Sequence, residues 1–137
     1  MDKLIDFTGK VLERVELGNT HDEVHPAWKD DTKEGLLICY ELLLSFQGNS
    51  FFTVKPCEID LPERYPGLGL SITESKSTKM VSALEELNLP SKVVHIEQSD
   101  FLGEDAINQY QLTLQNNKSI IIRHVFPPMS MGVKVEL

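Results

Sequence analysis

Two strand–turn–strand patterns, one in each half of the chain, limit most strongly what this sequence can fold into. In the first, an apolar run from Leu36 to Phe46 is followed by a polar turn and by Phe51 to Val54. In the second, Ile107 to Gln115 is followed by Asn116-Asn117-Lys118 and by Ser119 to Val125. Alternating apolar and polar side chains around a turn that contains Gly or Asn are typical of a β-hairpin. The sequence therefore predicts an antiparallel sheet.

The two hairpins follow one pattern when a single residue is inserted at Lys118. Leu44 to Asn49 then overlays Leu112 to Asn117, and each hairpin is followed by an aromatic residue, a proline and a strand that begins with glycine. One interpretation is an internal duplication with repeat halves 10–73 and 91–137. The other is that unrelated hairpins look alike, because turns favour Gly or Asn and half-buried strands alternate. In either case 137 residues predict one domain, 1–137.

The segment between the two halves has a different period. From Thr78 to Leu89 the apolar residues recur at intervals of three and four, and Pro90 follows. This predicts one main helix at about residues 78–89, packed on the sheet through its apolar face. Lys79 and the pair Glu85-Glu86 oppose the helix dipole, so its stability has to come from packing. The predicted fold class is α+β, with antiparallel β-meanders and this helix on the sheet.

Alternation also predicts which side chains face the core. Leu44 and Leu112 lie on the inner faces of the two hairpins, whereas Gln111 and Thr113 face solvent. The outer face of the first hairpin is apolar too, at Leu43 among others, so it has to be covered. We expect the helix or the segment before Phe7 to cover it, with a partner chain or a second copy as the alternative.

The charge of the chain limits its partners. It carries 21 acidic and 13 basic residues, a formal net charge of −8. Nucleic acids and anionic lipids are bound by neutralising phosphates with Lys and Arg, so this balance disfavours both. It favours a basic protein as partner. We expect no nucleic acid and no membrane among the partners, and a homo-oligomer stays open.

Two further absences in the sequence bear on its compartment. There is no apolar run long enough to span a bilayer and no secretory leader at the start, which predicts a cytoplasmic protein. Cys39 and Cys57 are too few for a disulfide scaffold and lack the neighbours of a zinc knuckle. We expect both thiols to be reduced.

The segment from Asn19 to Gly35 is the first place to look for function. Residues 1–66 have 13 acidic and 7 basic residues, a net charge of −6, and this segment has no helical or alternating period. It reads as a surface loop of 17 residues, longer than most loops in compact domains. Its composition is the best indication of function in the sequence.

Trp28, the only tryptophan, lies in this loop among acidic residues. One interpretation is that Trp28 folds back and plugs one end of the sheet. The other is that it anchors a basic protein within an acidic rim. The predicted partner-binding residues are Trp28, Asp22, Glu23, Asp30, Asp31 and Glu34.

The same loop contains the nearest approach to a metal motif. His21 and His25 are four residues apart, which could place two imidazoles on one helical face, but Pro26 follows directly. A solvated acidic loop is the better interpretation, so His21 and His25 are weak metal candidates and no cofactor is expected. His95 and His124 lie in predicted strands, where we expect half-buried, hydrogen-bonded structural residues. No nucleophile elbow, phosphate-binding loop or dinucleotide fingerprint occurs, and no catalytic residue is predicted.

We favour a non-enzymatic function from these observations. The hypothesis is a small acidic protein that binds and masks a basic protein partner, most concretely an immunity or antitoxin protein that neutralises a nuclease-type toxin. This form is an analogy from charge and size. The alternatives are an enzyme or metal-binding domain that uses the His21/His25 loop, and a self-associating β-module.

Overall fold

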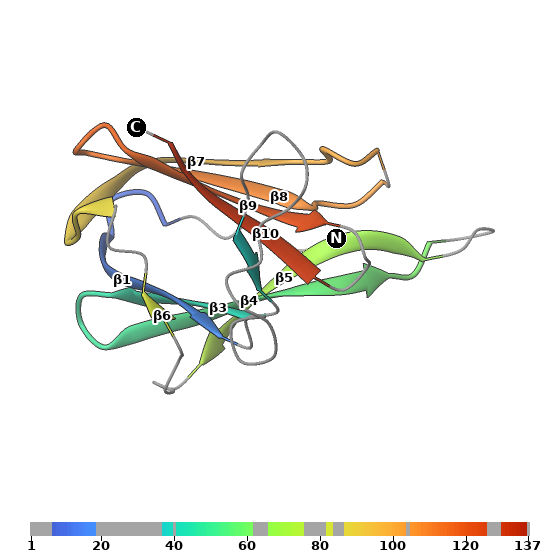
Figure 1. Cartoon of the computed structure of the whole chain (residues 1–137), viewed down its shortest axis with the longest axis horizontal. Coiled ribbons are helices and arrows are strands. Elements are labelled where there is room, and N and C mark those ends of the chain that lie inside the picture. The colour runs from blue at the N-terminus through green and yellow to red at the C-terminus, as the bar shows by residue number, and fades with distance from the viewer. Residues whose placement is uncertain are drawn as a thin grey trace.

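A computed structural model describes residues 7–18, 37–39, 41–61, 66–75, 82–83, 87–103, 105–125 and 130–136. These residues form ten strands, and every strand pair is antiparallel. The strands follow one path, β2-β10-β9-β8-β7-β1-β3-β4-β5, with β6 paired to β1. Figure 1 shows that this path is folded into two facing layers.

Each layer is built mainly from one half of the chain. The first unit comprises β1 (Val11–Gly18), β3 (Glu41–Phe46), β4 (Ser50–Ile59) and β5 (Gly67–Ser75). The second unit comprises β7 (Ser91–Ser99), β8 (Gln109–Leu114), β9 (Ser119–Val125) and β10 (Ser130–Glu136). Two short strands, β2 (Leu37–Cys39) and β6 (Ser82–Ala83), pair at the edges of β10 and β1.

The predicted helix at residues 78–89 is wrong, and the fold is not α+β. Ser82 and Ala83, in the middle of that range, form β6 and pair with Leu17 and Glu16 of β1. No α-helix occurs anywhere in the described part of the chain. The spacing of the apolar residues is helical, but the edge of β1 supplies hydrogen-bond partners for an extended segment, and unfavourable end charges weaken the helical alternative. No helix in the described ranges has the length and apolar character to cross a membrane.

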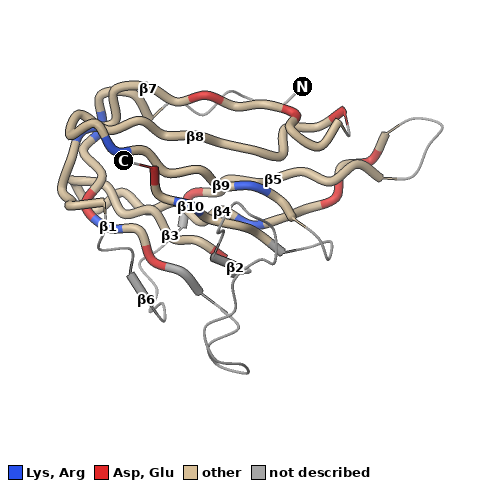
Figure 2. The backbone as a smooth tube through the Cα atoms, turned by 45° about the horizontal axis from the view of Figure 1, so that its top comes forward, with Lys and Arg blue, Asp and Glu red and all other residues tan. Residues whose placement is uncertain are grey.

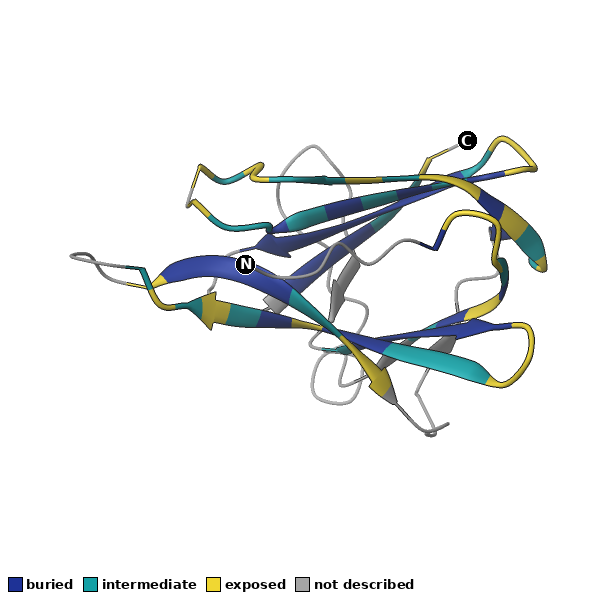
Figure 3. Ribbon diagram, turned by 180° about the vertical axis from the view of Figure 1, so that it is seen from behind, coloured by how far each residue is buried: buried dark blue, intermediate teal, exposed yellow. Residues whose placement is uncertain are grey.

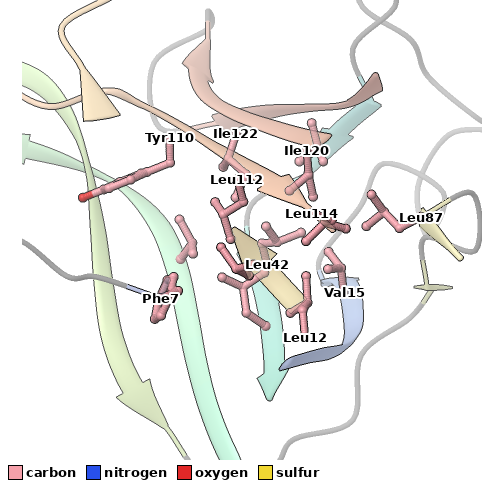
Figure 4. Close-up of a cluster of buried hydrophobic side chains, with 14 of the residues drawn as sticks. Phe7, Leu12, Val15, Leu42, Leu87, Tyr110, Leu112, Leu114, Ile120 and Ile122 are labelled. Carbon is pink, nitrogen blue, oxygen red and sulfur yellow. The ribbon is translucent and has the colours of Figure 1, made fainter. Parts of the chain in front are cut away.

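The core lies between the two layers and follows the predicted alternation. Leu42, Leu44 and Phe46 of β3 meet Leu112 and Leu114 of β8, and each is at most 1% exposed. Figure 4 shows Leu42, Leu112 and Leu114 converging, with Leu87 also in the cluster. The inner-face predictions are confirmed. Leu43, on the outer face of β3, is also buried, as expected for a covered face. The predicted helix cannot be its cover.

An aromatic cluster closes the core beside the first turn. Phe7 is fully buried, and its ring centroid lies 4.7 Å from that of Phe46 and 5.0 Å from that of Phe52. Phe46 and Phe52 meet edge to face at 5.9 Å. Such arrangements place the positive ring edge against a negative ring face. Phe7 is thereby fixed to the turn end of the first hairpin.

The turns of the two hairpins have the same length. Phe46 pairs with Ser50 across one turn, and the amide of Leu114 bonds to the carbonyl oxygen of Lys118 across the other, so each turn contains three residues. The overlay of the two hairpins therefore needs no insertion at Lys118. Positive φ angles occur at Asn49 and Asn117, the last residue of each turn.

The bulges of the two units match as well. Leu12 of β1 pairs with Phe46 and Arg14 with Ser45, so that Glu13 is an extra residue. In β7, Val93 pairs with Leu114 and His95 with Thr113, so that Val94 is the extra residue. A bulge at the same place in both units gives them a common geometry. Leu12 corresponds to Val93, and Leu17 corresponds to Gln98. Gene duplication remains a hypothesis for the origin of this equivalence.

Two junctions connect the layers. At one end β1 pairs with the start of β7, through Val11 with Lys92. At the other end β2 pairs with β10, whereas β3, one residue further along the chain, pairs with β1. The counterpart in the second unit is the bond from the amide of Leu70 in β5 to the carbonyl oxygen of Ile107, just before β8. Each hairpin is thus preceded by a segment that belongs to the opposite layer.

Candidate functional site

Asn108 fixes the loop between β7 and β8. It is fully buried, and its side-chain amide donates to Oδ1 of Asp100 at 2.7 Å and to the carbonyl oxygens of Ala106 at 3.2 Å and Leu68 at 3.3 Å. Its Oδ1 accepts from the amide of Leu102 at 3.1 Å. Two amide hydrogens shared among three acceptors saturate the donor capacity of this side chain. Asn108 therefore ties the loop to itself and to β5.

Asp100 stabilises the same loop from the other side. Its Oδ2 accepts from the amide of Asp105 at 2.9 Å, and its carbonyl oxygen accepts from the amide of Gly103 at 3.3 Å. Gly103 and Asp105 have φ angles of 73° and 60°, in the left-handed region. A short acidic side chain that bonds to nearby amides stabilises such turns. These bonds fix the backbone of the described loop residues, 100–103 and 105–108.

This loop presents an aromatic side chain. Phe101 is 54% exposed, one of two large hydrophobic residues that stand out in the described ranges. The guanidinium carbon of Arg123 lies 3.6 Å from its ring centroid, and Nε of Arg123 donates to Oε1 of Gln109 at 2.6 Å. Arg123 is only 7% exposed, so the cation–π contact is largely shielded from water. One side of the ring is held against the sheet while much of the side chain meets solvent.

Acidic residues lie in this loop and on the strand before it. Glu97, Asp100 and Asp105 are exposed, and Figure 2 shows acidic positions along β7 and in the loop that follows it. We call Phe101 with these three carboxylates the Phe101 surface. Its charge is opposite to that of a basic protein, which is the partner expected from the net charge.

The first unit has an ion pair at the positions that correspond to Arg123 and Gln109, and no aromatic ring of the described ranges shields it from water. Nζ of Lys55 in β4 lies 3.1 Å from Oε1 of Glu41 in β3. The two side chains are 53% and 27% exposed. A pair so open to water contributes little to stability. The buried arginine under an aromatic ring is specific to the second unit among the residues described.

A histidine lies beneath the loop, in the core. His124 of β9 is fully buried, and its Nδ1 lies 2.8 Å from the carbonyl oxygen of Gly69 in β5. Because a carbonyl only accepts, Nδ1 carries the proton and donates. The backbone amide of His124 bonds to the carbonyl oxygen of Asn108. These contacts indicate a structural role for His124, as expected, whereas His95 is exposed rather than half-buried.

The strands β9 and β7 differ in how far their residues are buried. All residues of β9 are buried, whereas Val93 is the one buried residue of β7 and the others are half-buried or exposed (Figure 3). No three His, Cys, Asp or Glu side chains converge on a metal geometry within the described ranges. Cys57 is not part of a disulfide within the described ranges. The groups that converge at the loop suit contact with a partner better than chemistry, because their hydrogen bonds go to the backbone and to each other.

The sequence-predicted site residues fall outside the part of the chain that the structure describes. This applies to the partner-binding set Trp28, Asp22, Glu23, Asp30, Asp31 and Glu34 and to the metal candidates His21 and His25. Sequence reasoning selected neither Phe101 nor the acidic residues of its loop. The available signal was a phenylalanine within the run Asp100-Phe-Leu-Gly-Glu-Asp105.

Comparison with known proteins gave no match: no family model, no curated protein and no solved structure is significantly similar to this chain. The function therefore has to be argued from the Phe101 surface itself.

Proposed function

We propose that this chain is a non-catalytic, cytoplasmic protein that binds and masks a basic protein partner through the Phe101 surface. The observation that carries the proposal is a Phe101 side chain that is 54% exposed and yet held against the buried Arg123. Its most concrete form is an immunity or antitoxin protein that occupies the cationic cleft of a nuclease-type toxin. That form rests on the charge and size of the chain.

The aromatic ring supplies the binding energy in this proposal. Burying an aromatic side chain in a partner's pocket removes a large apolar area from water. Because Asn108 and Asp100 already fix the loop, and Arg123 fixes the ring, little conformational entropy is lost on binding. Anchors of this kind dominate the energetics of protein interfaces.

The carboxylates supply the selectivity. Glu97, Asp100 and Asp105 are exposed on β7 and in the loop that carries Phe101, and the whole chain has a net charge of −8. Such a field accelerates the encounter with a basic surface and opposes approach to nucleic acid or anionic lipid. The segment from Asn19 to Gly35, with Trp28, Asp30 and Asp31, is a second contact in this proposal, carried by its composition alone.

The test is photo-cross-linking from the anchor position. Benzoylphenylalanine is placed at Phe101 and, as a matched control, at Gln47, which is exposed in the turn of the first hairpin. Cells that naturally produce the chain are irradiated, and the cross-linked protein is identified. We expect a protein with an excess of Lys and Arg to be captured from position 101 and not from position 47.

The captured partner then allows a quantitative check. Phe101→Ala is expected to weaken binding by about 2 kcal/mol or more, whereas Gln47→Ala leaves binding unchanged. Raising the salt concentration is expected to slow association, since the charges act mainly on the encounter. Equal capture from both positions, capture of an acidic protein, or no capture from position 101 would each reject the proposal.

A further inference from the structure

The equivalence of the two units extends to the outer edge of their first strands, where they differ. On β1, the edge opposite β3 is paired with β6, through Glu16 with Ala83 and Leu17 with Ser82. The corresponding residues of β7 are Glu97 and Gln98, since Leu12 corresponds to Val93 and each bulge adds one residue. Among the residues that the structure describes, none pairs with this edge of β7 beyond Val93.

The backbone groups on this edge point away from the sheet. The carbonyl oxygen of Ser99 accepts from the amide of Asn108, on the β8 side. Hydrogen-bonding direction alternates along a strand, so the amides and carbonyls of Gln98 and Ile96 face the opposite side. On β1, Leu17 corresponds to Gln98 and pairs there with β6. The geometry for one more antiparallel strand is therefore present on β7.

The side chains of this edge protect it only in part. Natural edge strands are commonly guarded by lysine, by other charged residues, by proline or by a bulge. The stretch from Val94 to Ser99 contains no lysine or proline, and its protection consists of the bulge at Val94 and the charge of Glu97. Val94 is 45% exposed, and His95 and Glu97 are exposed as well. An edge with an exposed apolar residue and an exposed carboxylate is suited to pairing with a basic chain.

We propose that the edge of β7 from Val94 to Gln98 binds an extended basic segment of the partner as an added antiparallel strand. This rests on the proposed function, which it makes more specific by naming how the partner binds. Addition of a strand to an exposed edge derives affinity from the backbone and selectivity from alternate side chains. Phe101 lies three residues after Gln98, in the loop that follows this edge, and its ring packs on Arg123 of β9, across β8 from the open edge. The edge is therefore a separate contact that the partner makes in addition to the Phe101 surface.

Charge selects a basic segment over a second copy of this chain. An added strand lies beside Glu97 and ends near Asp100, both exposed. Lys or Arg opposite these residues gives favourable cross-strand pairs, whereas like charges directly opposite are destabilising. Two copies paired edge to edge bring two chains of net charge −8 together and place carboxylates near carboxylates.

The experiment uses the full chain and a capped hexapeptide of alternating lysine and valine. Amide hydrogen exchange is followed by NMR with and without the peptide. We expect the amides of Ile96 and Gln98 to exchange at least about tenfold more slowly when the peptide is present, because they gain a hydrogen-bond acceptor. The exchange rates of the β9 amides are expected to change little, because β9 is already paired on both sides, with β8 and β10.

Two variants at position 98 distinguish the contribution of the backbone amide to peptide binding from that of the side chain. Gln98→Pro removes the outward amide and leaves the bonds to β8 in place, and Gln98→Thr keeps the amide. We expect Gln98→Pro to weaken peptide binding at least about tenfold and Gln98→Thr to stay within about twofold of the parent. If Gln98→Pro does not fold, the exchange data on the parent chain decide.

The outcomes distinguish this inference from the proposed function. Protection at other amides, no peptide binding, or equal binding by the two variants would overturn the edge inference. Protection of Ile96 and Gln98 that rises with protein concentration in the absence of peptide would identify a second copy as the occupant, and would overturn it too. A partner captured at Phe101 that binds Gln98→Pro as tightly as the parent refutes the edge while the proposed function stands.

Discussion

Replacing Asn108 by alanine tests whether one buried amide holds the Phe101 loop and the β5 junction together. The side chain bonds to Asp100, to the carbonyl oxygens of Ala106 and Leu68, and to the amide of Leu102. Alanine removes all four contacts at once. The amide of Leu102 and the carbonyl oxygen of Leu68 lose this partner at a site where Asn108 itself is fully buried.

The expected loss of stability is about 3 kcal/mol. The bonds to the two carbonyls are long and neutral and contribute about 0.5 kcal/mol each. The bond to the Asp100 carboxylate is charge-assisted, but Asp100 is exposed, so we assign it about 1 kcal/mol. Stranding the partly buried amide of Leu102 costs about 1 kcal/mol more. For a domain of this size the melting temperature should fall by about 10 °C.

Urea denaturation followed by circular dichroism measures this change. Gln111→Ala is the matched control, because Gln111 faces outward from β8 and should shift stability by less than about 0.5 kcal/mol. Exchange of the Leu102 and Asp105 amides should accelerate in Asn108→Ala, reporting a loosened loop. A loss under about 1 kcal/mol, or exchange as slow as in the parent, would show that Asn108 does not hold the loop.

Substitutions at Leu112, Thr113 and Gly69 test the core and the junction. Leu112→Ala should cost about 2–5 kcal/mol because Leu112 is 1% exposed in the core, whereas Thr113→Ala should be nearly silent; equal losses in urea denaturation would contradict the assignment of faces. Gly69→Ala should cost about 1–3 kcal/mol, because a Cβ there would lie 3.0 Å from the side chain of Ile59 and 3.2 Å from the carbonyl oxygen of Ile107. A melting temperature equal to that of the parent would show that the junction tolerates a methyl group.

Alternation predicted most strands, but it could not fix the relation between the two halves. Both inner faces follow from a period of two, which the structure confirms at Leu44 and Leu112. The strands that begin with glycine after the two hairpins, at Gly67 and at Gly132, do not align at these glycines. Ile72 and Val133 occupy the corresponding places, opposite Val54 and Ile122, so the alignment is displaced by four residues. A displacement by an even number of residues leaves every side chain on the same face of the sheet, so the alternating pattern cannot reveal the error in alignment.

The errors in the sequence analysis have separate physical causes. The spacing of Met80, Val81, Leu84 and Leu87 is helical, but an extended segment at Ser82 finds backbone partners on β1 that no local pattern reveals. The contact between Phe101 and Arg123 joins residues 22 apart in sequence through the packing of a loop on a sheet. Such a contact depends on tertiary structure, and composition alone directed attention to Trp28.

The pairing of β2 with β10 bears on how the protein is made. Ile38 pairs with Gly132, 94 residues later in the chain. At a synthesis rate of about 5 to 20 residues per second, β2 is made about 5 to 20 s before its partner strand. The first hairpin is complete long before, and its inner face meanwhile has no second layer to cover it. Residues 1–66 carry a net charge of −6, and this excess keeps neighbouring nascent chains apart during the interval. The acidic first half thus protects the unfinished protein from aggregation.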